Sequence, residues 1–263
     1  METEENALEQ SLRRAAVEPA ERPDFYRLLL ESTIYVIGPS DQVPEGEVTL
    51  QAGTTLQIQN WQRQDGSPVI PFFSSLEALQ SAIEIEASYV ALPARTLLEM
   101  TLGATLVLNP KSDYGKEFFP NEVEALLSEG VNKQSVQRMV AKETQVLLGQ
   151  PREYPSAMIA SLTSLLAKHG NVKAAYLALM HDPSVDEKPH LVIGIEADRD
   201  FEKVVREAGT VAGDMAADGE PVDLVRVVRS EAGLSQYFIE ETKPFYERTW
   251  GSKLRSVFGI GHA

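Results

Sequence analysis

Two histidines flank a short polar segment in the second half of the chain, and they are the first candidates for chemistry. His181 ends one predicted strand and His190 begins the next, with Asp182 and Asp186 in the loop between them. Imidazole nitrogens and carboxylate oxygens at the base of a hairpin could hold a divalent metal ion. A metal site also needs a fixed third ligand, which this pattern does not supply. We therefore predict a structural hairpin and no metal site.

A run of carboxylates follows the second of these strands. Glu196, Asp198, Asp200 and Glu202 resemble the opening of a calcium-binding loop, but such a loop carries glycine at its sixth position and glutamate at its twelfth. Counted from Asp198, the twelfth position is Gly209 and glycine is missing at the sixth. Carboxylates also stabilise the first turn of a helix. The run is predicted to cap a helix, and acid/base or metal chemistry is the less favoured interpretation.

Arg95 and Thr96 form a candidate anion site, because they follow a predicted strand and open a predicted helix. Backbone N–H groups at a helix start, together with a guanidinium, can bind an anion. A simple helix cap explains the same residues, so the cap is the favoured interpretation.

Familiar catalytic motifs are missing from the sequence. It contains no G-x-S-x-G, no G-x-x-x-x-G-K-[ST], no G-x-G-x-x-G after a strand and no H-E-x-x-H. The chain has no cysteine, which excludes disulfides, thiolate metal sites and a cysteine nucleophile. We predict no catalytic residues and no cofactor, and an enzyme is the less favoured class.

Hydrophobic periodicity places these residues in two domains of mixed helices and strands. At 263 residues the chain exceeds the usual size of one hydrophobic core, and a polar, proline-containing linker puts the boundary near residue 142. The fold class is predicted as α+β, with two small helix-on-sheet domains whose sheets are mixed or antiparallel. In the second domain we expect the order α-β-β-α-β-α, with a helix starting at Ser156, strands at 172–180 and 190–196, a helix from Asp200 and a strand at 222–228.

The first domain carries several local signals. Asp65-Gly66 predicts a hairpin between 56–61 and 69–73, and Pro68 and Pro71 push its second arm towards a sheet edge. Ser74 and Glu77 fit a capping box at the start of a helix. The aromatic pairs at 72–73 and 118–119 are predicted to lie mainly in the core.

Composition and charge limit the classes of partner that the chain could bind. With 43% hydrophobic and 24% charged residues the chain is globular, and its net charge of −15 opposes binding to nucleic acid or to an anionic membrane. The acidic start and the lack of a long apolar run predict a cytoplasmic protein.

Several segments spread along the whole chain are similar to the SseB family. They are 22–33, 69–79, 92–103, 115–120, 191–197 and 244–251. The resemblance implies an N-terminal SseB domain over 1–142 and a C-terminal SseB domain over 143–263. The family name refers to enhanced serine sensitivity, and the resemblance brings no catalytic residues or ligand with it.

Two function classes remain open. The first is a non-enzymatic interaction or regulatory protein that binds a protein partner, with self-association as a further form of contact. The alternative is an enzyme or small-ligand-binding protein of amino-acid metabolism that uses a cleft between the domains.

The C-terminal segment is the candidate interaction surface. Apolar residues recur at helical spacing from Tyr246 through Trp250 to Leu254, in a helix predicted to begin just after Pro244. Basic residues lie in the same segment on an otherwise acidic chain. The candidate surface comprises Tyr246, Arg248, Trp250, Lys253 and Leu254, and the alternative is a closing helix packed on its own sheet.

Overall fold

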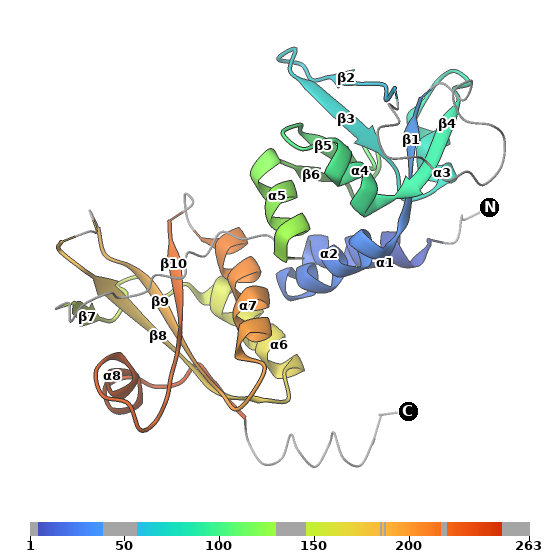
Figure 1. Cartoon of the computed structure of the whole chain (residues 1–263). Helices are drawn as coiled ribbons and strands as arrows, with labels where there is room; N and C mark the ends of the chain where they lie inside the picture. The colour runs from blue at the N-terminus through green and yellow to red at the C-terminus, as the bar shows by residue number, and fades with distance from the viewer. Residues whose placement is uncertain are drawn as a thin grey trace, which may run out of the picture. The chain divides into compact units, whose positions relative to one another are not determined.

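The computed structural model describes residues 5–38, 57–129, 146–184, 186, 188–216 and 220–248. The chain divides into two compact units, Met1–Asn132 and Lys133–Ala263 (Figure 1). Each unit combines helices with a mixed or antiparallel sheet, so the predicted α+β class is confirmed. The boundary predicted at 142 lies outside the described residues. No helix in the described part of the chain is long and apolar enough to cross a membrane.

The first unit packs helices against two small sheets. Its four-stranded sheet has the order β2-β3-β5-β6, and a separate antiparallel pair joins β1 to β4. The elements are α1 (Ala7–Val17), α2 (Arg22–Glu31), β1 (Thr33–Ile37), β2 (Trp61–Gln62), β3 (Pro68–Phe72), α3 (Leu76–Ala82), β4 (Tyr89–Pro93), α4 (Ala94–Met100), β5 (Leu106–Leu108), β6 (Lys116–Phe118) and α5 (Pro120–Glu129), with a 3-10 turn at Pro19–Glu21.

The core of the first unit joins α1, α2, α4 and α5 to the strands. Phe25, Leu29, Phe72 and Phe118 are fully buried within it. Phe73 is buried in a second cluster under α3, whereas Phe119 is 48% exposed. Of the four phenylalanines predicted to lie mainly in the core, three are therefore in it.

The predicted hairpin forms, but β3 is not at an edge. Gly66 supplies the turn with a positive φ of 81°, and β3 lies between β2 and β5. Pro71 is tolerated there because β2 pairs only with Pro68 and Val69, and the next contact on that side is the bridge from Phe73 to Tyr35. The missing N–H of Pro71 thus falls in a gap of the ladder.

A capping box occurs at the start of α1 and not at the start of α3, where it was predicted. Ser75, not Ser74, caps α3 by accepting a hydrogen bond from the N–H of Ala78. The full reciprocal box is at the start of α1, between Asn6 and Glu9. The Glu9 carboxylate also accepts hydrogen bonds of 2.7 Å from the hydroxyls of Ser74 and Ser75.

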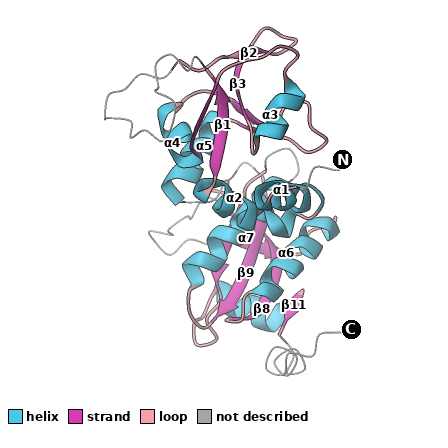
Figure 2. Ribbon diagram, turned by 90° about the vertical axis from the view of Figure 1, so that its right-hand side faces the viewer, coloured by secondary structure: helices cyan, strands magenta, loops and turns pink. Residues whose placement is uncertain are grey.

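The second unit has one sheet with helices on both faces. Figures 1 and 2 show α6 (Ser156–Lys168) and α7 (Phe201–Met215) on one face, and Figure 1 shows α8 (Leu234–Glu241) on the other. The strand order is β10-β9-β8-β11, and β7 also pairs with β8. These strands are β7 (Leu147–Gly149), β8 (Val172–His181), β9 (His190–Ala197), β10 (Val222–Arg226) and β11 (Tyr246–Glu247).

The connection from β9 through α7 to β10 joins two parallel strands. All other pairings in this sheet are antiparallel, including the long β8–β9 hairpin. The predicted order α-β-β-α-β-α is present as α6-β8-β9-α7-β10-α8, with β7 and β11 added at the β8 edge.

The segment after Pro244 begins as a strand and not as the predicted helix. The N–H of Phe245 donates to the carbonyl of Ala175, and that of Arg248 donates to the carbonyl of Lys173. Tyr246 and Glu247 thereby form β11 against β8. The prediction of a helix starting at Pro244 is therefore wrong for residues 244–248. These residues pair with the edge of β8, although their apolar spacing is that of a helix.

Candidate functional site

The two histidines of the β8–β9 hairpin lie at positions that separate them. His190 is directly opposite Met180, and His181 is paired with Leu147 on the other side of β8. Because neighbouring residues of a strand point to opposite faces, the side chains of Met180 and His181 diverge, and that of His190 shares the face of Met180. The two imidazoles therefore point to opposite faces of the sheet and do not meet at the hairpin base.

His190 is instead held between two aspartates. Its Nε2 lies 2.9 Å from Oδ2 of Asp223 on β10, and its Nδ1 lies 3.5 Å from Oδ2 of Asp186 in the hairpin loop. All three side chains are almost completely buried. The described residues contain no group of three or more histidines and carboxylates that could hold a metal ion. The cluster ties the hairpin loop and β10 to β9.

Two of the four carboxylates in the predicted run, Glu196 in β9 and Asp198 after it, form ion pairs. The buried Glu196 accepts two hydrogen bonds from Arg229, at 2.8 and 2.9 Å, and Asp198 pairs with Lys173. Asp200 occupies the N-cap position of α7 with a left-handed backbone, and its side chain makes no capping hydrogen bond. Asp200 and Glu202 thus lie at the N-cap and in the first turn of α7, as predicted, but the predicted capping hydrogen bond of Asp200 is wrong, because a residue at φ 50° does not direct its carboxylate to the helix N–H groups.

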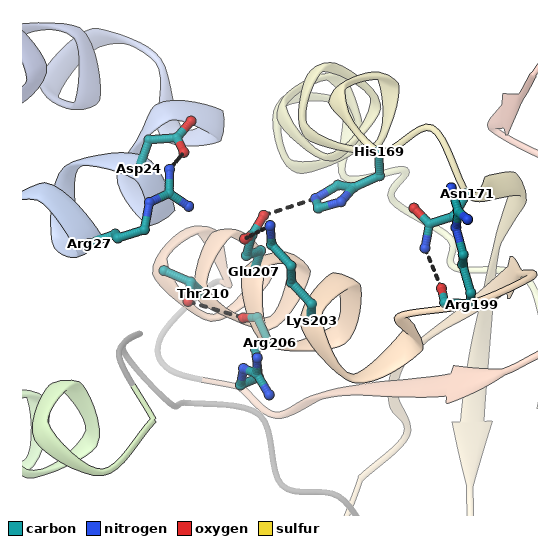
Figure 3. Close-up of polar contacts among 9 residues, drawn as sticks. All are labelled: Asp24, Arg27, His169, Asn171, Arg199, Lys203, Arg206, Glu207 and Thr210. Carbon is teal, nitrogen blue, oxygen red and sulfur yellow. Dashed lines mark hydrogen bonds and ion pairs between the residues drawn. The ribbon is translucent and has the colours of Figure 1, made fainter.

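A further polar contact joins the end of α6 to the middle of α7. Nε2 of His169 lies 2.9 Å from Oε2 of Glu207, and Lys203 lies 3.9 Å from the other oxygen of the same carboxylate (Figure 3). His169 ends α6, as its position before Gly170 predicts, but its main partner is a side chain of the neighbouring helix.

The candidate anion site at Arg95 and Thr96 lies in the first turn of α4. Arg95 is exposed, Thr96 is half-buried, and α4 has only seven residues with no side-chain cap. The favoured interpretation of these two residues as a helix cap is wrong, because Pro93 holds the N-cap position. Their role in anion binding stays a prediction.

The candidate C-terminal surface is only partly within the described chain. Tyr246 lies in β11, and the guanidinium of Arg248 donates to the carbonyl of Gly170. Trp250, Lys253 and Leu254 lie outside the described residues.

A basic pocket that the sequence did not indicate lies beside the start of α7. It has a volume of about 560 Å³ and is lined by Arg199, Asp200, Phe201, Glu202, Lys203, Arg206 and Arg226. We call it the α7 pocket. Lys203 and Arg206 are three residues apart on α7, which places them on one helix face, and Arg199 directly precedes the N-cap of the same helix. Arg226 comes from a different strand, and only the fold brings it to this place.

Comparisons with known proteins cover both units. The family model described as "SseB protein N-terminal domain" matches residues 8–125, and the "SseB protein C-terminal domain" matches residues 140–248. "Protein SseB" of Escherichia coli (strain K12) is 44% identical to this chain over 255 residues, which are 97% of each chain. "Protein SseB" of Shigella flexneri is similar to the same extent. No solved structure matches the chain.

Proposed function

The chain belongs to the SseB family, and from this premise we propose that it acts as a cytoplasmic, non-enzymatic interaction or regulatory protein. Its target in this proposal is a protein partner, whereas nucleic acid and membranes are not targets. The net charge of −15 supports the exclusion of nucleic acid and membranes as targets, since it repels phosphate backbones and anionic lipid.

The main support for the proposal is that two histidines and the buried glutamate that could do chemistry are bonded to residues of other elements. In the second unit, His190 is bonded to Asp223, Glu196 to Arg229 and His169 to Glu207. Each pair joins two different elements of the fold: β9 to β10, β9 to the segment after β10, and α6 to α7. Groups that are engaged in this way hold the sheet and its helices together, which is a structural role.

The contact surface in this proposal is the C-terminal segment, with Tyr246, Arg248, Trp250, Lys253 and Leu254. Two features support it. The segment is basic on an acidic chain, which favours an acidic partner. Its first residues are anchored to β8 by the hydrogen bonds of Phe245 and Arg248.

The structure determines where to truncate the chain for a test. A truncation before Lys243 removes β11 and exposes the edge of β8, so a loss of binding would be confounded with a loss of stability. A chain ending at Arg248 keeps β11 and removes Trp250, Lys253 and Leu254. We expect this shorter truncation to keep its melting temperature and to lose the partner that the full chain captures, as measured by pull-down with mass spectrometry and then by titration of the purified partner.

A charge-reversal pair provides the matched control. Lys253→Glu should weaken the same interaction, whereas Lys188→Glu, an exposed position on the β8–β9 loop, should not. Equal binding by the full chain and by the chain ending at Arg248 would contradict the proposed surface. Turnover of a substrate by the purified protein would contradict the non-enzymatic role.

A further inference from the structure

We propose that the α7 pocket binds a small molecule that carries a multiply charged anionic group, either a phosphate ester or a polycarboxylate. This inference concerns a different part of the molecule from the C-terminal contact surface, and it holds or fails independently of that surface.

The charge of the pocket is opposite to that of the chain as a whole. Four of its seven lining residues are cationic and two are acidic, in a protein of net charge −15. A local positive field within an acidic surface concentrates anions at that place. The pocket is therefore the opposite of what the overall composition leads one to expect.

The cations of the pocket differ from other cations of this unit in their contacts. Lys173, Arg229 and Arg248 are used in bonds to Asp198, Glu196 and the Gly170 carbonyl. Within the described residues, no carboxylate lies at ion-pair distance from Arg199, Arg206 or Arg226. Lys203 has only the 3.9 Å contact with Glu207, which His169 already engages (Figure 3). These guanidinium groups keep their donors available for an anion.

The stacking of Arg226 on Phe201 gives the pocket a fixed element. The guanidinium carbon lies 5.4 Å from the centre of the Phe201 ring, within the range of a cation–π contact. Phe201 begins α7 and Arg226 ends β10, so the contact joins the two sides of the pocket. A guanidinium held against a ring loses less freedom when it binds an anion than a free one does.

The position in the fold is one where ligands commonly bind. β9 and β10 are parallel, Arg226 is at the carboxyl end of β10, and the residues after β9 lead directly into α7. In open parallel α/β sheets, ligands bind outside the carboxyl ends of the strands, and the one parallel pair of this sheet places the start of α7 in the corresponding position. The volume of about 560 Å³ is that of a small-molecule site, which favours a metabolite over an extended polymer.

Binding of pyrophosphate and of citrate to the full-length protein, measured by calorimetry at constant ionic strength, is the test. We expect one saturable site per chain for at least one of the two, and the stronger binder distinguishes phosphate esters from carboxylates. The double variant Arg199→Gln/Arg206→Gln should weaken this binding by about tenfold or more, because two charge-assisted hydrogen bonds are lost. Both residues are exposed, so the variant should fold normally, which circular dichroism checks.

Two further variants separate a site from general charge effects. Arg152→Gln removes one positive charge from an exposed position of the same unit outside the pocket and should leave binding unchanged. Asp200→Asn removes a negative charge from the pocket wall and keeps a residue type that accepts the left-handed backbone, so it should tighten binding several-fold. The proposal is overturned if neither probe binds up to about 10 mM. It is also overturned if Arg152→Gln weakens binding as much as the double variant does.

Discussion

Gly194 on β9 lies where the sheet meets α8, and its lack of a side chain sets how closely the helix packs. A Cβ at this position would lie 2.7 Å from Cγ2 of Val227 and 2.8 Å from two ring carbons of Phe238. Both neighbours are buried in the cluster between the sheet and α8. The contact therefore cannot be relieved by moving a side chain into solvent.

Replacing this glycine should destabilise the second unit. For Gly194→Ala we expect a loss of about 1–3 kcal/mol in the free energy of unfolding, the usual cost of overfilling a packed core. Urea denaturation followed by fluorescence measures it. Gly149→Ala is the control, because a Cβ there meets nothing within 4 Å, and its effect should stay within about 0.5 kcal/mol. Equal stability of the two variants would show that α8 moves away at little cost.

Glu9 connects the start of α1 to the loop before α3, and this contact depends on pH. Burial raises the pKa of the Glu9 carboxyl, but the hydrogen bonds from Ser74, Ser75 and Asn6 lower it by more, so the pKa lies below its usual value. A carboxylate whose pKa is lower in the folded than in the unfolded state stabilises the fold above the unfolded pKa, and this stabilisation is lost as the pH falls through the folded pKa.

The comparison of wild type with Glu9→Gln over a range of pH tests this contact. At neutral pH we expect the variant to be less stable by about 1 kcal/mol, since the charged acceptor of the hydrogen bonds is lost. As the pH falls below the pKa of a free glutamate, the difference should shrink and then vanish. A difference that stays constant down to acid pH would mean that the Glu9 charge contributes nothing to the fold.

Local sequence patterns could identify candidate residues but not their distant partners. The hairpin pattern pointed to His190 and Asp186, yet the shorter contact of His190 is with Asp223, which is 33 residues away. The same holds for Arg229 and Glu196, and for Arg226 in the α7 pocket. These contacts depend on the parallel pairing of β10 with β9, and a sequence pattern within one element carries no information about that pairing.

At the scale of elements, one ion pair joins the segment between β10 and α8 to β9. Arg229 follows β10 and donates two hydrogen bonds to Glu196, whose side chain is only 8% exposed. Arg229 itself is largely exposed, so solvent weakens the attraction. The larger cost arises when the buried carboxylate loses its partner.

Removing the arginine should therefore destabilise more than removing both charges. We expect Arg229→Gln to cost about 1–3 kcal/mol in the free energy of unfolding, and the double variant with Glu196→Gln to recover part of it. Denaturation of the two single variants and the double variant, arranged as a double-mutant cycle, measures the coupling. Strictly additive effects would show that Glu196 and Arg229 act separately.

Helices, whose hydrogen bonds lie within one segment, and long strands could be predicted from the sequence. The helix from Ser156, the β8–β9 hairpin and the helix from Asp200 follow from periodicity and turn signals, and all three are present. β11 could not be predicted in this way, because Tyr246 and Glu247 are strand residues only through the free edge of β8. Short strands form because a neighbouring strand pairs with them, and their own sequence is too short to show a strand pattern.

At the scale of the whole molecule, the buried clusters follow the division of the chain. The cluster around Phe25 and the cluster under α3 contain residues of the first unit alone, and the cluster around Phe238 contains residues of the second unit alone. Each sheet is also completed within one unit. The two family models match on either side of the same division.

Each unit should consequently fold without the other. A domain of about 130 residues buries enough of its surface to be stable alone, and each unit has its own sheet, helices and buried aromatic residues. We expect the fragments 1–132 and 133–263, expressed separately, to give dispersed amide spectra by NMR and cooperative thermal unfolding. The α7 pocket and all its lining residues belong to the second fragment, so this fragment should also retain the anion binding of the full chain. A second fragment that is unfolded alone but folds when the first is added would show that the units depend on each other, because the cores described above would then be insufficient.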